Sequence, residues 1–133
     1  MPKKVAICDH TTEHYVETMK DVLSRRGHQV EHYYNRNPRD VYDKVAQLRA
    51  DVVILDLHRE PEDNEKEPVD WWGVQILRLI KGDSKLDNTR VMVGTKYPRE
   101  DLKNYIRSLG VPDDCWFDPL ITTPKRVQDM VEK

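Results

Sequence analysis

Five short apolar segments alternate along the chain with longer segments in which apolar residues recur every three or four positions. The apolar segments predict β-strands over residues 4–9, 28–34, 51–56, 90–95 and 114–118. Two stretches within them, 5–8 and 52–55, are apolar at every position, which is typical of parallel strands covered on both faces. The pattern therefore predicts an α/β fold in which a parallel sheet lies between two layers of helices.

The longer segments carry apolar stripes at helical spacing. The stripes are Val16, Met19 and Leu23; Val41, Val45 and Leu48; Val74, Leu77 and Ile80; Leu102, Tyr105, Ile106 and Leu109; and Val127, Met130 and Val131. Each stripe gives its helix one face that can pack against the sheet. Together with the strands, these helices predict a (βα)5 chain folded as a doubly wound, three-layer sandwich.

Residue types suited to helix ends flank several of these stripes. Those expected to begin helices are Asn37 with Pro38, Pro98, and Thr123 with Pro124. Gly27 and Gly110 follow the first and fourth stripes, where a left-handed residue commonly ends a helix. The last helix is expected from about residue 123 to 133.

The connection after the third predicted strand is longer than the roughly two to six residues usual between such elements. From His58 to Asp70 it contains six acidic residues against two basic ones, and the whole insertion spans about 58–72. We expect a solvated, partly mobile loop. The alternative is a partner-binding flap that carries Trp71 and Trp72, because long loops at strand ends often carry function.

Composition narrows the class of protein. The 133 residues include 22 Lys and Arg against 24 Asp and Glu, a formal net charge of −2, which argues against a non-specific nucleic-acid binder. This length predicts one domain over 1–133.

No apolar run approaches the roughly 20 residues that span a bilayer, so no membrane association is expected. The sequence begins Met-Pro-Lys-Lys without the apolar stretch of a signal peptide, which predicts a cytoplasmic protein.

The sequence lacks the motifs of several kinds of binding and catalytic site. The glycines form neither GxGxxG nor GxxxxGK[ST], so no cofactor-binding residues are assigned. Ser24, Ser84 and Ser108 fall in or near helix ends rather than on a strand-to-helix elbow. Cys8 and Cys115 lack the grouped ligands of a structural zinc site, and we expect buried free thiols. An enzyme acting on a small-molecule substrate is therefore disfavoured.

Polar residues follow the predicted strands, and ligands of open α/β sheets gather at the carboxyl ends of the strands. The residues at these ends are Asp9 and His10, Asp56, Thr95 and Lys96, and Asp118. Carboxylates of Asp9 and Asp56 on neighbouring central strands suit a divalent cation whose shell water completes, as Mg²⁺ prefers. Thr95 adds a hydroxyl on the adjoining strand. The sequence thus predicts a functional site at this edge of the sheet.

Five motifs in order carry a family resemblance: residues 5–9 (VAICD), residues 51–57 (DVVILDL), Gly73, residues 91–95 (VMVGT), and Asp118-Pro119. They resemble the CheY-like receiver domains of response regulators in two-component signalling, over residues 4 to about 133. The resemblance implies a flavodoxin-like fold with sheet order 2-1-3-4-5. That order separates the first and fifth strands, so it also implies no disulfide between the two cysteines.

The resemblance also implies roles for individual residues. Asp56 would be the phosphoacceptor, and Thr95 would take part in the same chemistry. Lys96 stands where the family usually has a small residue, and it is added to the predicted catalytic residues as a hypothesis. Asp9, Asp56 and the backbone carbonyl of His58 would hold Mg²⁺. The donor would be a histidine kinase or a phosphotransfer protein, and a downstream protein would bind the surface formed by the fourth helix, fifth strand and fifth helix. Any catalysis would be limited to phosphorylation and dephosphorylation of Asp56 itself, without direct contact with nucleic acid.

Three residues depart from the family pattern. His10 stands where such domains have a second acid, so the affinity for Mg²⁺ should be weak. Asp118 replaces a lysine that contacts the aspartyl phosphate in the family. A phosphoryl group on Asp56 is therefore expected to be repelled by Asp118. At an effective dielectric near 20 and a separation of about 5 Å, the interaction between each pair of unit charges is roughly 3 kcal/mol. Cys115 aligns with the switch aromatic, while the adjacent Trp116 is expected to face the other side of its strand.

Two hypotheses concern compensation for these departures. Lys96 either replaces the missing positive charge or pairs with Asp118 to leave a self-neutralised pocket; the alternative is an ordinary solvent-facing lysine. His10 pairs with Asp56 or Asp118, which would make the pocket sensitive to pH near neutrality.

Three functions follow from these observations. The first is a receiver that accepts a phosphoryl group on Asp56 and relays it through protein contacts, favoured by Asp9, Asp56 and Thr95. The second is a phosphorylation-independent pseudo-receiver that acts as a protein-binding module, favoured by His10, Cys115 and Asp118. The third is a flavodoxin-like flavin or cobalamin binder, or a small enzyme. The sequence does not identify the kinase, the output partner, the oligomeric state or any longer parent protein.

Overall fold

The computed structural model describes residues 2–11, 14–97 and 99–133, and within them five parallel strands form one sheet of order β2-β1-β3-β4-β5. The strands are β1 (Lys4–Cys8), β2 (Gln29–Tyr33), β3 (Val52–Asp56), β4 (Arg90–Gly94) and β5 (Trp116–Phe117). All neighbouring strands pair in parallel. The predicted flavodoxin-like (βα)5 class and strand order are confirmed.

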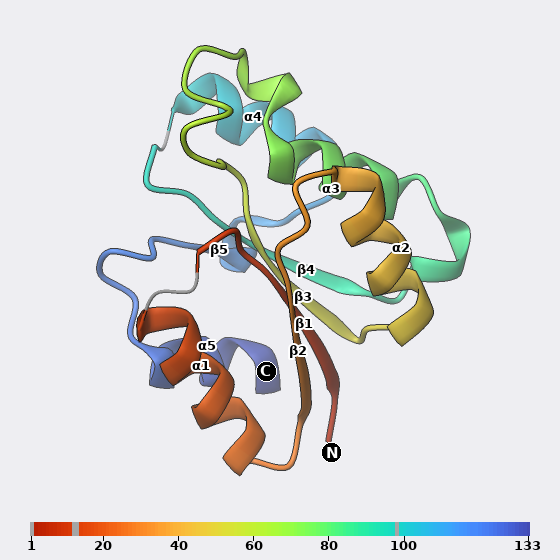
Figure 1. Cartoon of the computed structure of the whole chain (residues 1–133), viewed down its shortest axis with the longest axis vertical. Helices are drawn as coiled ribbons and strands as arrows, with labels where there is room; N and C mark the ends of the chain where they lie inside the picture. Colours follow the sequence, from red (N-terminus) through yellow and green to blue (C-terminus); the bar gives the residue numbers. More distant parts are fainter. Residues whose placement is uncertain (1, 12–13, 98) are drawn as a thin grey trace.

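Two layers of helices cover the sheet (Figure 1). The helices are α1 (His14–Arg25), α2 (Pro38–Leu48), α3 (Trp72–Lys81), α4 (Glu100–Ser108) and α5 (Pro124–Glu132). Helices α1 and α5 pack together on one face, and α2, α3 and α4 lie on the other. In the described part of the chain, no helix combines the length and apolar character needed to cross a membrane.

Each central strand contributes to both cores, as its continuous apolar run predicts. Val5 and Ile7 of β1 pack on the α1–α5 side, while Ala6 and Cys8 pack on the opposite side, because successive side chains of a strand alternate. Cys8 and Cys115 are both buried and free, and β1 is separated from β5 by β3 and β4. The predicted absence of a disulfide is therefore confirmed.

Most of the predicted helix ends are confirmed. Asn37 caps α2, its side-chain oxygen accepting from the backbone N–H of Arg39 at 2.9 Å, and Pro38 is the first helical residue. Thr123 caps α5 in the same manner, with Pro124 next. The two predicted left-handed glycines, Gly27 and Gly110, have φ of +87° and +95°. Pro98, predicted to open the fourth helix, lies outside the described residues, and α4 begins at Glu100.

The fifth strand is shorter than predicted. Residues 113–115 form a 3₁₀ turn, so Cys115 lies in that turn, and only Trp116 and Phe117 pair with β4. Asp118 turns the chain away: its side chain accepts from the N–H of Leu120 at 2.9 Å, and Pro119 has no N–H for a ladder. Strand pairing therefore stops at Phe117, immediately before Asp118.

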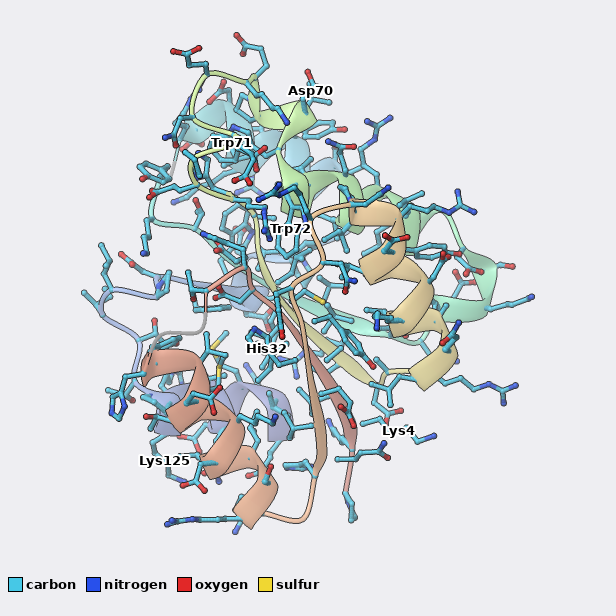
Figure 2. The ribbon with its side chains drawn as sticks, in the orientation of Figure 1. Lys4, His32, Asp70, Trp71, Trp72 and Lys125 are labelled. Atoms are coloured by element: carbon cyan, nitrogen blue, oxygen red, sulfur yellow. The ribbon has the colours of Figure 1, made fainter. Side chains whose placement is uncertain are left out.

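The acidic insertion is a folded loop rather than a flap (Figure 2). Asp63 is 1% exposed, and its Oδ2 accepts from the backbone N–H groups of Arg59 at 2.8 Å and Trp72 at 2.7 Å. Lys66 lies 3.5 Å from the other oxygen. Trp71 and Trp72 are 5% and 2% exposed, so the idea that they contact a partner from a flap is wrong: their indoles belong to the core.

Gly73 fixes the approach of α3 to β3. A Cβ at this position would lie 2.1 Å from the backbone oxygen of Asp56, so no other residue fits without a shift of backbone. Its N–H donates to the carbonyl of Leu57 at 2.9 Å. The end of β3, which carries Asp56, is thereby held directly against the first turn of α3.

Candidate functional site at the carboxyl ends of the strands

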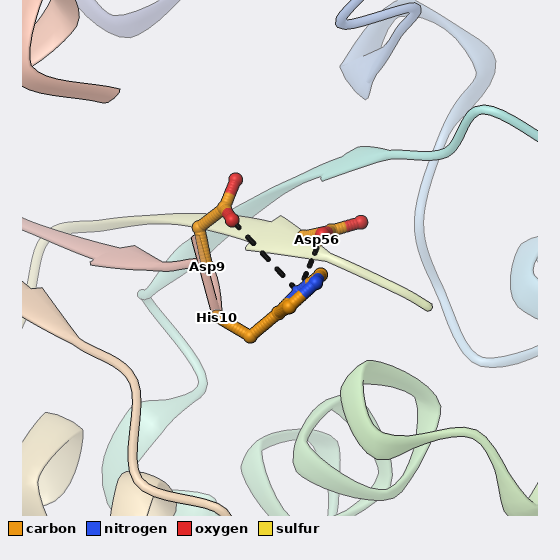
Figure 3. A group of neighbouring side chains, drawn as sticks. All are labelled: Asp9, His10 and Asp56. Carbon is orange, nitrogen blue, oxygen red and sulfur yellow. Dashed lines mark ion pairs between the residues drawn. The ribbon is translucent and has the colours of Figure 1, made fainter. Parts of the chain in front are cut away.

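Three side chains meet where β1 and β3 end (Figure 3). The Nδ1 atom of His10 lies 3.3 Å from Oδ2 of Asp56 and 4.0 Å from Oδ1 of Asp9. One potential ligand atom from each residue lies within 4.8 Å of the other two. The strand pairing explains this meeting, because Cys8 is in register with Leu55 and the residues that follow them emerge side by side.

Asp56 ends β3 in a largely enclosed position, with its side chain 17% exposed. Its partner in the sheet register is Gly94, and the ring of Phe117 lies where a side chain at Gly94 would stand. Burial raises the pKa of Asp56 to about 6, although the His10 contact and the N–H of His58 act in the opposite direction. Near neutral pH, Asp56 is therefore mainly a carboxylate.

Asp9 is held by the residue two positions further along. The backbone N–H and the hydroxyl of Thr11 donate to Oδ1 of Asp9 at 2.9 and 2.8 Å. The carbonyl of Asp9 is contacted by the ring of His32 at 2.8 Å. The two Thr11 hydrogen bonds fix the direction of the Asp9 carboxylate without using its second oxygen.

His10 lies against Asp56, which is one of the two alternatives predicted for it. The Asp56 carboxylate holds the pKa of His10 above its ordinary value, against the lowering effect of burial. The imidazole also presents its edge to the ring of Trp72, with 6.4 Å between ring centroids. An imidazolium here supplies positive charge directly beside two carboxylates.

A cavity of about 80 Å³ opens beside this group. Its polar lining includes Asp9, Thr11, Asp56 and Lys96, and its apolar lining includes Phe117. Pockets for drug-sized ligands or cofactors occupy roughly 300–1,000 Å³. The small size of this cavity argues against the flavin or cobalamin alternative and suits a small group such as a phosphoryl group.

Lys96 and Asp118 do not behave as a pair. Lys96 lines the cavity, whereas Asp118 does not line it. Among the described residues no ion pair joins Lys96 to Asp118, so the predicted self-neutralised pair is wrong. The physical reason is the short fifth strand: the Asp118 carboxylate caps the turn that follows it and accepts from Leu120.

Thr95 and His58 lie on the neighbouring loops. The Thr95 hydroxyl is buried and accepts from the N–H of Tyr97 at 3.0 Å. The ring of His58 packs between Trp71 and Tyr97, with centroids 4.7 and 4.6 Å away, and burial lowers its pKa. The backbone N–H of His58 donates to Asp56 Oδ1 at 3.4 Å, so the backbone of His58 borders the site while its side chain does not.

Sequence reasoning missed this aromatic cluster and the buried Asp63. Both join residues of the insertion to other elements, and no periodic pattern marks such contacts. The position of Tyr97 two residues after Thr95 was the available signal for the cluster. For Asp63, the signal was only an acid at the centre of the insertion, among other acids that are exposed or half-buried.

The residues present match Mg²⁺ poorly. Mg²⁺ favours oxygen ligands in a nearly ideal octahedron. Here the imidazole nitrogen of His10 lies between the two carboxylates, at the position from which a third oxygen ligand would otherwise come. The weak affinity expected for Mg²⁺ stays a prediction.

Comparison with family models finds no match, and comparison with curated protein sequences finds none either. Among solved structures, the signal receiver domain of a putative LuxO repressor protein from Vibrio parahaemolyticus has a TM-score of 0.75 at 18% identity, covering 99% of this chain and 88% of that one. The Vibrio cholerae chemotaxis protein CheY4 has a TM-score of 0.75 at 16% identity, and the match covers 99% of this chain and 98% of that one. The N-terminal domain of a response regulator receiver protein from Methanoculleus marisnigri has a TM-score of 0.65 at 19% identity, and the match covers 98% of this chain and 91% of that one. The chain has the receiver-domain fold.

Proposed function

We propose that this chain is a cytoplasmic receiver domain that accepts a phosphoryl group on Asp56 from a histidine kinase or a phosphotransfer protein. The observation that carries the proposal is the position of Asp56. It ends the central strand of a receiver fold and lines a small cavity together with Asp9 and Lys96. A second carboxylate and a lysine around a strand-end aspartate suit transfer of a small, highly charged group.

The proposed transfer moves a phosphoryl group between two side chains. A carboxylate oxygen of Asp56 attacks the phosphorus of a phosphohistidine on the donor protein, the new O–P bond forms and the P–N bond breaks. The imidazole leaves with the electron pair of the broken bond and takes a proton from water. Because the pKa of Asp56 is about 6, the attacking carboxylate is mainly ionised at pH 7 and above.

Lys96 supplies the positive charge that the incoming group requires. Its side chain lines the same cavity as Asp56, and it follows directly after Thr95 at the end of β4. In phosphoryl transfer, such cationic groups stabilise charge on the equatorial oxygens. Thr95 is proposed to take part through its hydroxyl, whose proton remains available because the oxygen acts as acceptor toward Tyr97. Output is proposed to pass to a protein that binds the α4–β5–α5 surface.

One observation favours a second candidate function. His10 already occupies the neighbourhood of Asp56 at 3.3 Å, and Asp118 adds no positive charge. An ion pair of this kind neutralises Asp56 without a phosphoryl group. The second candidate is therefore a pseudo-receiver that binds its protein partner independently of phosphorylation.

Intact-protein mass spectrometry separates the two candidates. The protein is incubated with acetyl phosphate and a divalent cation, beside Asp56→Asn and the matched exposed control Asp87→Asn. We expect a mass gain of one phosphoryl group in the unsubstituted protein and the control, and none in Asp56→Asn. A folded protein that gains no mass from acetyl phosphate or from a panel of phosphorylated histidine-kinase domains would support the pseudo-receiver.

A further inference from the structure

Tyr15 brings a further hydroxyl-bearing side chain to the cavity beside Asp56. It is the second residue of α1, and its ring packs against the core that α1 and α5 form with one face of the sheet. The cavity of about 80 Å³ is lined by Tyr15 as well as by Asp9, Thr11, Asp56 and Lys96. The helix that follows β1 therefore contributes to the same site as the strand ends.

The Tyr15 hydroxyl lacks a hydrogen bond to the protein. Its oxygen is buried, and within the described residues it has no hydrogen-bond partner. A buried tyrosine hydroxyl ordinarily has one, because burial removes the hydration of a polar group and leaves its cost uncompensated. A group of this kind is uncommon in a folded protein, and here it belongs to a side chain in the wall of a cavity. The observation points to a bound group that accepts from the hydroxyl.

Three side-chain donors line this cavity within the part of the chain that the structure describes. They are Thr11, Tyr15 and Lys96, and the other polar side chains of the lining are carboxylates. The hydroxyl of Thr11 donates to Oδ1 of Asp9 at 2.8 Å, so its proton is already used. The Tyr15 hydroxyl and the Lys96 ammonium are therefore the donors that remain for an anion in the cavity.

A neutral donor suits a phosphoryl group in these surroundings. Such a group has three acceptor oxygens and a charge near −2, and hydrogen bonds to charged acceptors are the strong ones. Asp118 offers no donor, because its carboxylate accepts from the N–H of Leu120. Burial, and after it the charge of Asp9, raise the pKa of Tyr15 to about 12, so the phenol keeps its proton throughout the neutral range.

We propose that Tyr15 is a further catalytic residue, whose hydroxyl donates a hydrogen bond to an oxygen of the phosphoryl group that Asp56 accepts. The inference rests on the proposed function and adds to it a neutral donor from α1, beside the positive charge of Lys96. The phenol keeps its proton, and the bonds that form and break are those of the transfer itself.

The variant Tyr15→Phe tests the proposal, because it removes the hydroxyl and keeps the ring. Phosphorylation is followed over time by intact-protein mass spectrometry, with acetyl phosphate and a divalent cation and, in parallel, with phosphorylated histidine-kinase domains. We expect Tyr15→Phe to gain the phosphoryl group at least 10-fold more slowly than the unsubstituted protein, since loss of one such donor costs about 10²–10³-fold in rate. Tyr34→Phe, at a position 54% exposed and outside the cavity lining, should keep the unsubstituted rate.

Urea unfolding of the same variants separates this role from a structural one. Phenylalanine has no buried hydroxyl to leave unpaired, so the free energy of unfolding of Tyr15→Phe should equal or exceed that of the unsubstituted protein. An unchanged rate in Tyr15→Phe, or a slower rate together with lower stability, would overturn the inference and leave Asp56 as the phosphoacceptor. If the unsubstituted protein gains no phosphoryl group from either donor, the inference and the proposed function are both overturned.

Discussion

His10 is the residue that most distinguishes this site, because it brings a titratable nitrogen to within 3.3 Å of the Asp56 carboxylate. The sequence placed Asp9, His10 and Asp56 at one edge of the sheet, since parallel strands end together. It left open whether His10 faces Asp56 or Asp118. That choice depends on where β5 stops, and the turn at Asp118 is a local competition that a strand pattern does not reveal.

Replacing His10 should raise the pKa of Asp56. In His10→Asn the imidazole no longer opposes the effect of burial, so the pKa of Asp56 should move above its value of about 6. Carboxyl ¹³C chemical shifts followed against pH, with a chelator present, measure it directly. A pKa that is unchanged or lower in the variant would contradict the electrostatic role given to His10.

Asp56→Asn should increase stability above pH 6. The folded-state pKa of about 6 lies above the ordinary value of 3.8, so Asp56 contributes stability below pH 4 that is lost as the pH rises through 6. Asparagine does not titrate, and the advantage of the variant in the free energy of unfolding should therefore grow between pH 4 and pH 8, on the order of 1–3 kcal/mol.

Urea unfolding with a chelator present, at pH 4, 6 and 8, provides this comparison. Asp87→Asn, at an exposed position, controls for the general effect of removing one carboxylate. A difference between Asp56→Asn and the unsubstituted protein that shrinks as pH rises would be inconsistent with a raised Asp56 pKa.

At the scale of elements, the five helices and the four longer strands follow from apolar periodicity and end residues. The insertion does not, because its structure depends on a single buried acid, Asp63, in a segment whose other acids face solvent or lie near the surface. From composition alone, such a segment is predicted to be a solvated loop. The contacts that fold it are hydrogen bonds from two backbone N–H groups to the Asp63 carboxylate, donated by residues four and nine positions away.

Asp63→Ala should destabilise the protein by about 2–4 kcal/mol, because two backbone N–H groups lose their buried acceptor. Glu65→Ala, at an exposed position of the same loop, should change the free energy of unfolding by no more than about 0.5 kcal/mol. Chemical denaturation of both variants gives the comparison. Equal effects for the two substitutions would show that Asp63 does not organise the insertion.

At the scale of the whole molecule, the alternation of strands and helices establishes the three layers, and the family resemblance supplied the strand order. The placement of the site follows from that order: β1 and β3 are neighbours, so Asp9 and Asp56 meet, while β4 brings Lys96 to the same cavity. The account as a whole depends on Asp56 being the residue that this architecture presents to a phosphodonor.

Reductive trapping tests that claim most directly. After exposure to acetyl phosphate, borohydride reduces an aspartyl phosphate to the alcohol, converting the modified aspartate to homoserine, and peptide mass spectrometry locates it. The account predicts homoserine at position 56 and its absence in Asp56→Asn. Homoserine at Asp9, Asp118 or another aspartate, or none in a folded protein that has been treated with both acetyl phosphate and phosphorylated kinase domains, would contradict it.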